Sequence, residues 1–122
     1  MSSEKEAYKY ILNEYLKIVF HFSDKDYQKR VWIENKGPEC QAFDDAVCDF
    51  FDIGDPILDK YEKFGVSKFQ FDLLEEFRSQ FERFSAAHDL PQLFIDTPEW
   101  DKIVGMAKQV LAAFKREKNE DL

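Results

Sequence analysis

The side chains that could carry catalytic or metal chemistry are few and widely spaced. His21 and His88 lie far apart, and no recognisable motif surrounds either of them, so we expect both on helix surfaces or at helix ends. Cys40 and Cys48 lack the C-x-x-C spacing of zinc and redox sites. No Gly-rich phosphate loop, G-x-S-x-G or H-E-x-x-H motif is present. We therefore expect no enzyme activity, no metal and no cofactor.

One segment comes close to the spacing of a calcium-binding loop. Gly54 is the sixth residue counted from Asp49, as in an EF-hand. The third and fifth positions, however, are Phe51 and Ile53, and the twelfth is Lys60 where a bidentate Glu is needed. Because these residues supply no oxygen ligand, the sequence argues against a calcium site.

Acidic residues are concentrated in one fifth of the chain. The 122 residues carry a net charge of −8. Residues 1–38 hold six acids and seven bases, and residues 63–122 hold eleven acids and nine bases. Residues 39–62 hold eight acids and one base, Lys60, so nearly all of the excess lies there. This balance argues against a nucleic-acid binder, which needs clusters of Lys and Arg for phosphate contacts.

Helical spacing separates these acids from apolar residues in the same segment. At 100° per residue, Phe43, Val47, Phe50 and Phe51 fall on one side of a helix, and Asp45, Asp49 and Asp52 fall on the other. Like charges four apart destabilise a helix by about 0.2–0.5 kcal/mol per pair. The row contains no Lys or Arg, unlike the mixed charges of residues 75–83.

The carboxylate row has two interpretations. It is either a face that keeps the protein dispersed in water, or a surface that docks a basic partner. Trp32 or Tyr27 could supply an aromatic anchor for such a partner, although either ring could equally belong to the core. The candidate partner-binding residues are Glu39, Asp44, Asp45, Asp49, Asp52, Asp55, Asp59, Glu62 and Trp32.

Helix caps and apolar periodicity predict six helical segments that position these residues. The expected ranges are 3–22, 24–35, 40–53, 55–65, 67–87 and 97–114, followed by a frayed charged tail at 115–122. The second segment is ambiguous, because Val31-Trp32-Ile33 would also suit a short strand. Gly54 is the expected stop of the third helix, with Asp55 as the N-cap and Pro56 as the first residue of the fourth.

The predicted fold is a single all-α domain spanning residues 1–122, a compact bundle of about five to six helices. Thirteen Phe residues supply much of the core, and four Gly and four Pro are too few for an all-β fold rich in tight turns. The N-terminus does not resemble a secretory signal, and the longest apolar run, residues 18–20, is too short to span a bilayer. Two unpaired thiols fit a reducing compartment, so we expect a cytoplasmic protein that binds no membrane.

Two stretches resemble a known group of proteins. These are residues 31–52, which include Val31-Trp32, Gly37-Pro38-Glu39 and Phe43-Asp-Asp-Ala-Val47, and residues 93–100, Leu-Phe-Ile-Asp-Thr-Pro-Glu-Trp. With the helix that follows, they resemble immunity proteins of bacterial contact-dependent growth inhibition and other polymorphic toxin systems, over residues 8–114. The resemblance implies a cytosolic protein that neutralises the C-terminal domain of a cognate toxin, with no chemistry of its own. Such toxins are often nucleases with basic clefts.

Two other functions stay open at this point. The same carboxylates could mimic nucleic acid and block a DNA-binding protein, which capture of the bound partner would reveal. The chain could also be a small helical enzyme or metal protein, which metal analysis of the purified protein would test.

Overall fold

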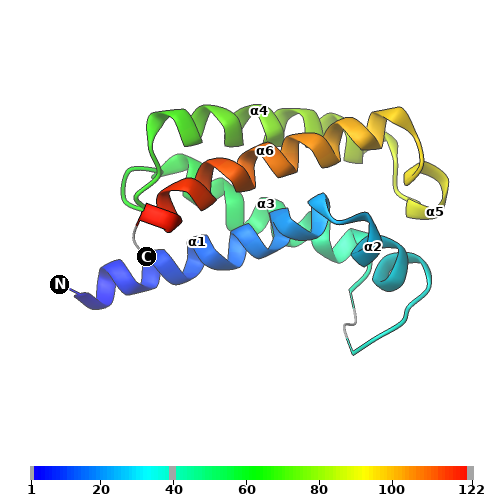
Figure 1. Cartoon of the computed structure of the whole chain (residues 1–122), viewed down its shortest axis with the longest axis horizontal. Coiled ribbons are helices and arrows are strands. Elements are labelled where there is room, and N and C mark those ends of the chain that lie inside the picture. Colours follow the sequence, from blue (N-terminus) through cyan, green and yellow to red (C-terminus); the bar gives the residue numbers. More distant parts are fainter. Residues whose placement is uncertain (1, 39–40, 121–122) are drawn as a thin grey trace.

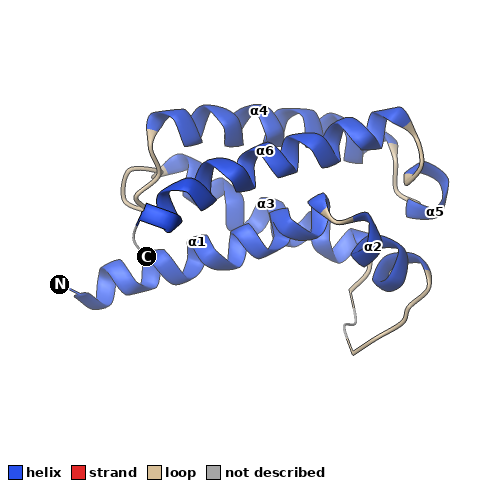
Figure 2. Cartoon of the chain, viewed as in Figure 1, coloured by secondary structure: helices blue, strands red, loops and turns tan. Residues whose placement is uncertain are grey.

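The computed structural model describes residues 2–38 and 41–120, and the side chains of residues 4–38 and 41–114. These residues form six α-helices and one π-helix, and within them no strand is present (Figure 2). The prediction of an all-α bundle is therefore confirmed. The helices are α1 (Ser2–Ser23), α2 (Lys25–Tyr27), the π-helix η1 (Gln28–Ile33), α3 (Phe43–Asp59), α4 (Lys68–Ala87), α5 (Pro91–Phe94) and α6 (Pro98–Glu120).

The four long helices form a bundle in which each packs against two neighbours (Figure 1). Helices α1 and α4 both pack against α6 on one side and against α3 on the other. As a result, α3 and α6 lie diagonally opposite each other. The short elements α5 and η1 contact each other at one end of the bundle.

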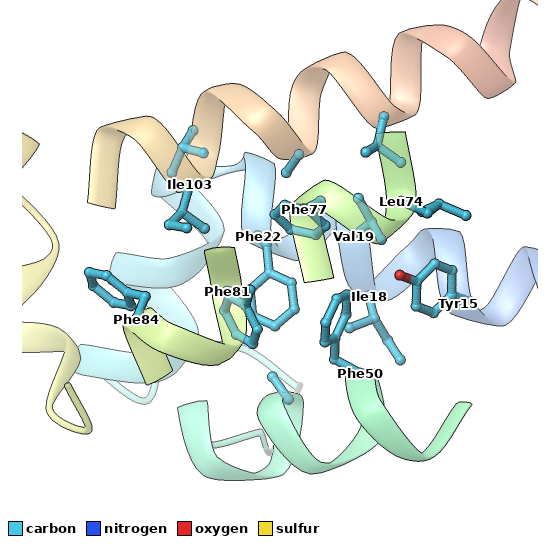
Figure 3. Close-up of a cluster of buried hydrophobic side chains, with 14 of the residues drawn as sticks. Tyr15, Ile18, Val19, Phe22, Phe50, Leu74, Phe77, Phe81, Phe84 and Ile103 are labelled. Atoms are coloured by element: carbon cyan, nitrogen blue, oxygen red, sulfur yellow. The ribbon is translucent and has the colours of Figure 1, made fainter. Parts of the chain in front are cut away.

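The core is built largely from aromatic rings that the sequence placed on helical stripes. Phe22 of α1, Phe50 of α3 and Phe81 of α4 meet near its centre (Figure 3). The Phe81 ring centroid lies 4.6 Å from that of Phe22 and 4.9 Å from that of Phe50. Each buried Phe contributes about 1.5–3 kcal/mol to folding. Trp100 closes the end of the core nearest α5 and is fully buried.

Helix α4 begins with the predicted capping box. The Gln70 backbone N–H donates to the Ser67 hydroxyl at 3.1 Å, and the Ser67 N–H donates to the Gln70 side-chain oxygen at 2.8 Å. These bonds satisfy donors that the first turn of a helix leaves free. This start of the helix follows from local sequence alone.

The predicted break at Gly54 is wrong, because α3 continues from Phe43 to Asp59. Gly54 is buried inside the helix, and Pro56 is also internal. An internal proline removes one helical hydrogen bond and is unfavourable by about 3 kcal/mol. Burial of Phe50 and Ile57 on either side of these residues offsets that penalty. The chain turns instead at residues 60–65, where Gly65 has a φ of +75°.

The second segment is helical, and the alternative of a strand at residues 31–33 is wrong. As predicted, Asp24 caps its start, with its carboxylate accepting the Tyr27 N–H at 3.1 Å. The segment then widens into a π-helix that ends where the Glu34 N–H donates to the Lys29 carbonyl, five residues back. This wider turn brings Tyr27 and Trp32 onto one buried side.

The remaining differences lie at helix ends. The region after Leu90, predicted as a loop, contains the short helix α5. Helix α3 begins at Phe43, three residues later than the predicted start at Cys40. Cys40 itself lies outside the described residues. Helix α6 begins at Pro98 as predicted, with the Thr97 hydroxyl accepting the Trp100 N–H at 3.3 Å.

Candidate functional site

The two sides of α3 differ sharply in polarity. Its buried residues are Phe43, Ala46, Phe50, Gly54 and Ile57, which face α1 and α4. Its exposed acids are Asp44, Asp45, Asp49, Asp52, Asp55 and Asp59, and we call these six residues the acidic face. The predicted separation of carboxylates from apolar residues is confirmed by this arrangement.

Asp55 differs from the rest of the acidic face because an arginine neutralises it. The Arg78 guanidinium of α4 binds its carboxylate at both oxygens, with Nε–Oδ1 at 2.6 Å and Nη2–Oδ2 at 3.2 Å. This hydrogen bonding raises the pKa of Arg78. The predicted role of Asp55 as an N-cap is wrong, since it lies inside α3 and pairs with a neighbouring helix.

The other carboxylates of the acidic face are exposed to water and have no basic partner among the described side chains. In the part of the chain that the structure describes, no Lys or Arg lies within ion-pair distance of Asp44, Asp45, Asp49, Asp52 or Asp59. Asp45 has one internal role: its Oδ2 accepts the Ala42 N–H at 3.2 Å and so caps the start of α3. The charge of the face is therefore largely available to a binding partner.

A hollow between α3 and α4 extends the acidic surface beyond α3. Asp55, Asp59, Glu75 and Glu76 line it together with Arg78. Because Arg78 is already paired with Asp55, the hollow presents excess negative charge. Sequence reasoning missed Glu75 and Glu76, since they appeared on a helix face of mixed charge. Only the pairing of Arg78 across the two helices shows that its charge is already neutralised.

Trp32 belongs to the core and is not an exposed anchor for a partner, the other role considered for it. Its side chain is 8% exposed and its ring centroid lies 5.3 Å from that of Phe43. Its indole N–H donates to the Gln41 side-chain oxygen at 3.1 Å, and the Tyr27 hydroxyl donates to the same atom at 3.1 Å. Neither ring offers an exposed anchor, so both drop out of the candidate docking surface.

Two further candidates lie outside α3. Glu62 is exposed in the turn that follows the helix. Glu39 lies outside the described residues. The described surface thus comprises the acidic face together with Glu62, Glu75 and Glu76.

The two histidines pack separately against aromatic rings. The ring centroid of His21 lies 3.9 Å from that of Tyr27, and the ring centroid of His88 lies 4.2 Å from that of Phe84. Cys48 is exposed on α3. Among the described side chains, no group of three or more His, Cys, Asp and Glu is arranged to hold a metal ion.

No helix within the described ranges combines the length and the apolar character needed to cross a bilayer. Comparison of the chain with protein-family models, curated proteins and solved structures gave no match.

Proposed function

We propose that this protein is an immunity protein that binds a cognate toxin domain, a basic nuclease, and blocks it through the acidic surface centred on residues 39–62. The observation that carries the proposal is the row of exposed carboxylates on α3 that lack basic partners among the described residues. The resemblance of residues 31–52 and 93–100 to toxin-system immunity proteins adds the identity of the partner. On this proposal the protein acts in the cytosol and needs no catalytic group.

The charge density of α3 suits a cleft that binds a phosphate backbone. At a rise of 1.5 Å per residue, the five carboxylates that remain from Asp44 to Asp59 when the paired Asp55 is left out span about 22 Å, or about 5.6 Å per charge. One strand of B-DNA carries a phosphate every 3.4 Å or so along the axis. A cleft whose Lys and Arg side chains bind phosphates can therefore meet carboxylates at a comparable spacing.

Charge reversal on α3 tests the proposal. The variant Asp49→Lys/Asp52→Lys/Asp59→Lys keeps Asp45, which caps the helix, and Asp55, which binds Arg78. The variant also turns the repulsion between Asp45 and Asp49, four residues apart on the helix, into an attraction between Asp45 and a lysine. Each such attractive pair stabilises a helix by about 0.2–0.5 kcal/mol. We expect a fold at least as stable as the wild type, together with loss of toxin neutralisation.

The measurement is the survival of cells that co-express this chain with a candidate cognate toxin domain. The control variant is Glu6→Lys/Asp89→Lys/Glu99→Lys, which changes the net charge equally at exposed positions away from α3. It should still protect. Full protection by the α3 variant would refute the assigned surface, and binding of a DNA-binding regulator but not of the toxin domain would favour a nucleic-acid mimic.

A further inference from the structure

The side of the bundle centred on α6 carries a strip of exposed and half-exposed apolar side chains. Phe20 of α1 is 53% exposed, and Phe69 of α4 is 65% exposed. Phe20 lines a hollow with Leu111 and Ala112 of α6, and Ala112 also lines a second hollow with Phe69 and Leu73. Because both hollows share Ala112, the five residues form one continuous surface, which we call the apolar strip.

Charges around the apolar strip are balanced. The hollow beside Phe20 is lined by two acids and two bases, and the hollow beside Phe69 by no charged residue. A third hollow, on the other side of Phe20, contains one acid and one base, Glu14 and Lys17, whose side chains pair at 2.8 Å. Counted over the described side chains that line these three hollows, the strip is therefore close to neutral in a chain of net charge −8.

We infer that the apolar strip is the contact surface between two copies of this chain, related by a twofold axis. A nearly neutral strip attracts neither a cationic protein nor the anionic surface of a membrane. A second copy brings the same apolar area and the same balance of acids and bases. The contact then buries apolar surface without burying net charge, and each acid can meet a base of the other copy.

The position of the strip also keeps mutual repulsion low. Helix α6 lies diagonally opposite α3, and packed helix axes are about 8–10 Å apart. The acidic faces of the two copies would then lie about 20 Å or more apart, beyond the Debye length of about 8 Å at physiological salt. Both acidic faces would point outward and stay open to partners.

Sedimentation velocity of the full chain, over a range of concentrations, tests this inference without any toxin. We expect the wild type to reach twice the mass of the chain as the concentration rises. The variants Phe20→Glu, Phe69→Glu and Ala112→Arg should stay monomeric. All three positions are largely exposed, so the helical circular dichroism should not change. Leu93→Glu, at a residue of α5 that is 74% exposed, is the matched control and should still dimerise.

A wild type that stays monomeric at every concentration would overturn the inference. So would dimers of equal strength in the strip variants, or equal weakening by Leu93→Glu. Added salt should change the association little, because the contact is mainly apolar and the two acidic faces lie beyond the Debye length, whereas a dimer that dissociates in salt would place the contact on charged surface elsewhere. The inference is separable from the proposed function, because monomeric variants keep the acidic face and should still neutralise the toxin.

Discussion

Gly54 of α3 lies directly against the Tyr15 ring of α1. A Cβ atom added to Gly54 would lie 2.6 Å from Cε1 of Tyr15, closer than such contacts occur in proteins. Tyr15 itself is fully buried and stacks on Phe50, with ring centroids 5.5 Å apart. The absence of a side chain at Gly54 therefore lets α1 and α3 approach each other at this point.

Gly54→Ala should destabilise the fold by about 1–3 kcal/mol, because the added methyl group overpacks the contact with Tyr15. Urea unfolding measures the change. Gly105→Ala is the control, since its added Cβ would meet nothing within 4 Å in α6. That variant should gain about 0.5–1 kcal/mol from helix propensity. An equal gain at both positions would contradict the close approach of Gly54 to Tyr15.

Tyr15 should make the fold sensitive to alkali. Burial, reinforced by the Asp55 carboxylate and opposed by Arg78, raises the pKa of Tyr15 above its ordinary value of 10.0. The folded state thus favours the protonated phenol. The resulting contribution to the free energy of unfolding is complete below about pH 10 and falls by up to about 1.4 kcal/mol per pH unit above it.

The test compares urea unfolding of the wild type and Tyr15→Phe between neutral pH and about pH 11. The variant should lose less stability at alkaline pH than the wild type. Tyr10→Phe, at a side chain that is largely exposed, should behave like the wild type. Parallel pH profiles for all three proteins would show that the Tyr15 phenol does not contribute.

The Arg78–Asp55 pair should contribute modestly to stability. Both groups are partly exposed, so a double-mutant cycle with Arg78→Gln and Asp55→Asn should give a coupling of about 0.2–1 kcal/mol that declines with salt. Arg78→Gln also frees the Asp55 carboxylate within the acidic face. On the proposed function, this variant should bind the toxin domain at least as fast as the wild type, and slower binding would contradict the electrostatic role of the surface.

Gln28 should be the polar residue whose loss weakens the core most clearly. It is fully buried, its Nε2 donates to the His21 carbonyl at 2.8 Å, and its Oε1 accepts the Trp100 indole N–H at 2.8 Å. Gln28→Ala removes the acceptor of the Trp100 indole N–H, at about 1–3 kcal/mol, and it also removes one hydrogen bond to the His21 carbonyl, which keeps the Asp24 N–H as a donor. Urea unfolding should show this loss, whereas Gln109→Ala, at an exposed position of α6, should change stability by less than about 0.5 kcal/mol. Equal effects would contradict the buried network.

Local sequence was sufficient to predict the all-α class, the starts of α4 and α6, and the polar and apolar sides of α3. Ser67 and Gln70 mark the start of α4 because a capping box forms between residues three apart. The carboxylates of α3 face outward because helical spacing puts them opposite Phe43 and Phe50. These features depend only on neighbours within one or two helical turns, so the local sequence is enough to predict them.

Tertiary packing decided the features that depend on residues far apart in the chain. Gly54 reads locally as a helix stop, yet it lies buried inside α3, where it packs against Tyr15 of α1. Asp55 reads locally as a helix N-cap, yet it lies inside α3 and Arg78 of α4 binds it. Trp32 could have been core or surface until Phe43 and Gln41 were seen to enclose it. The position of each of these residues depends on contacts between separate segments of the chain. The periodicity of one segment does not predict which side chains of another segment will pack against it.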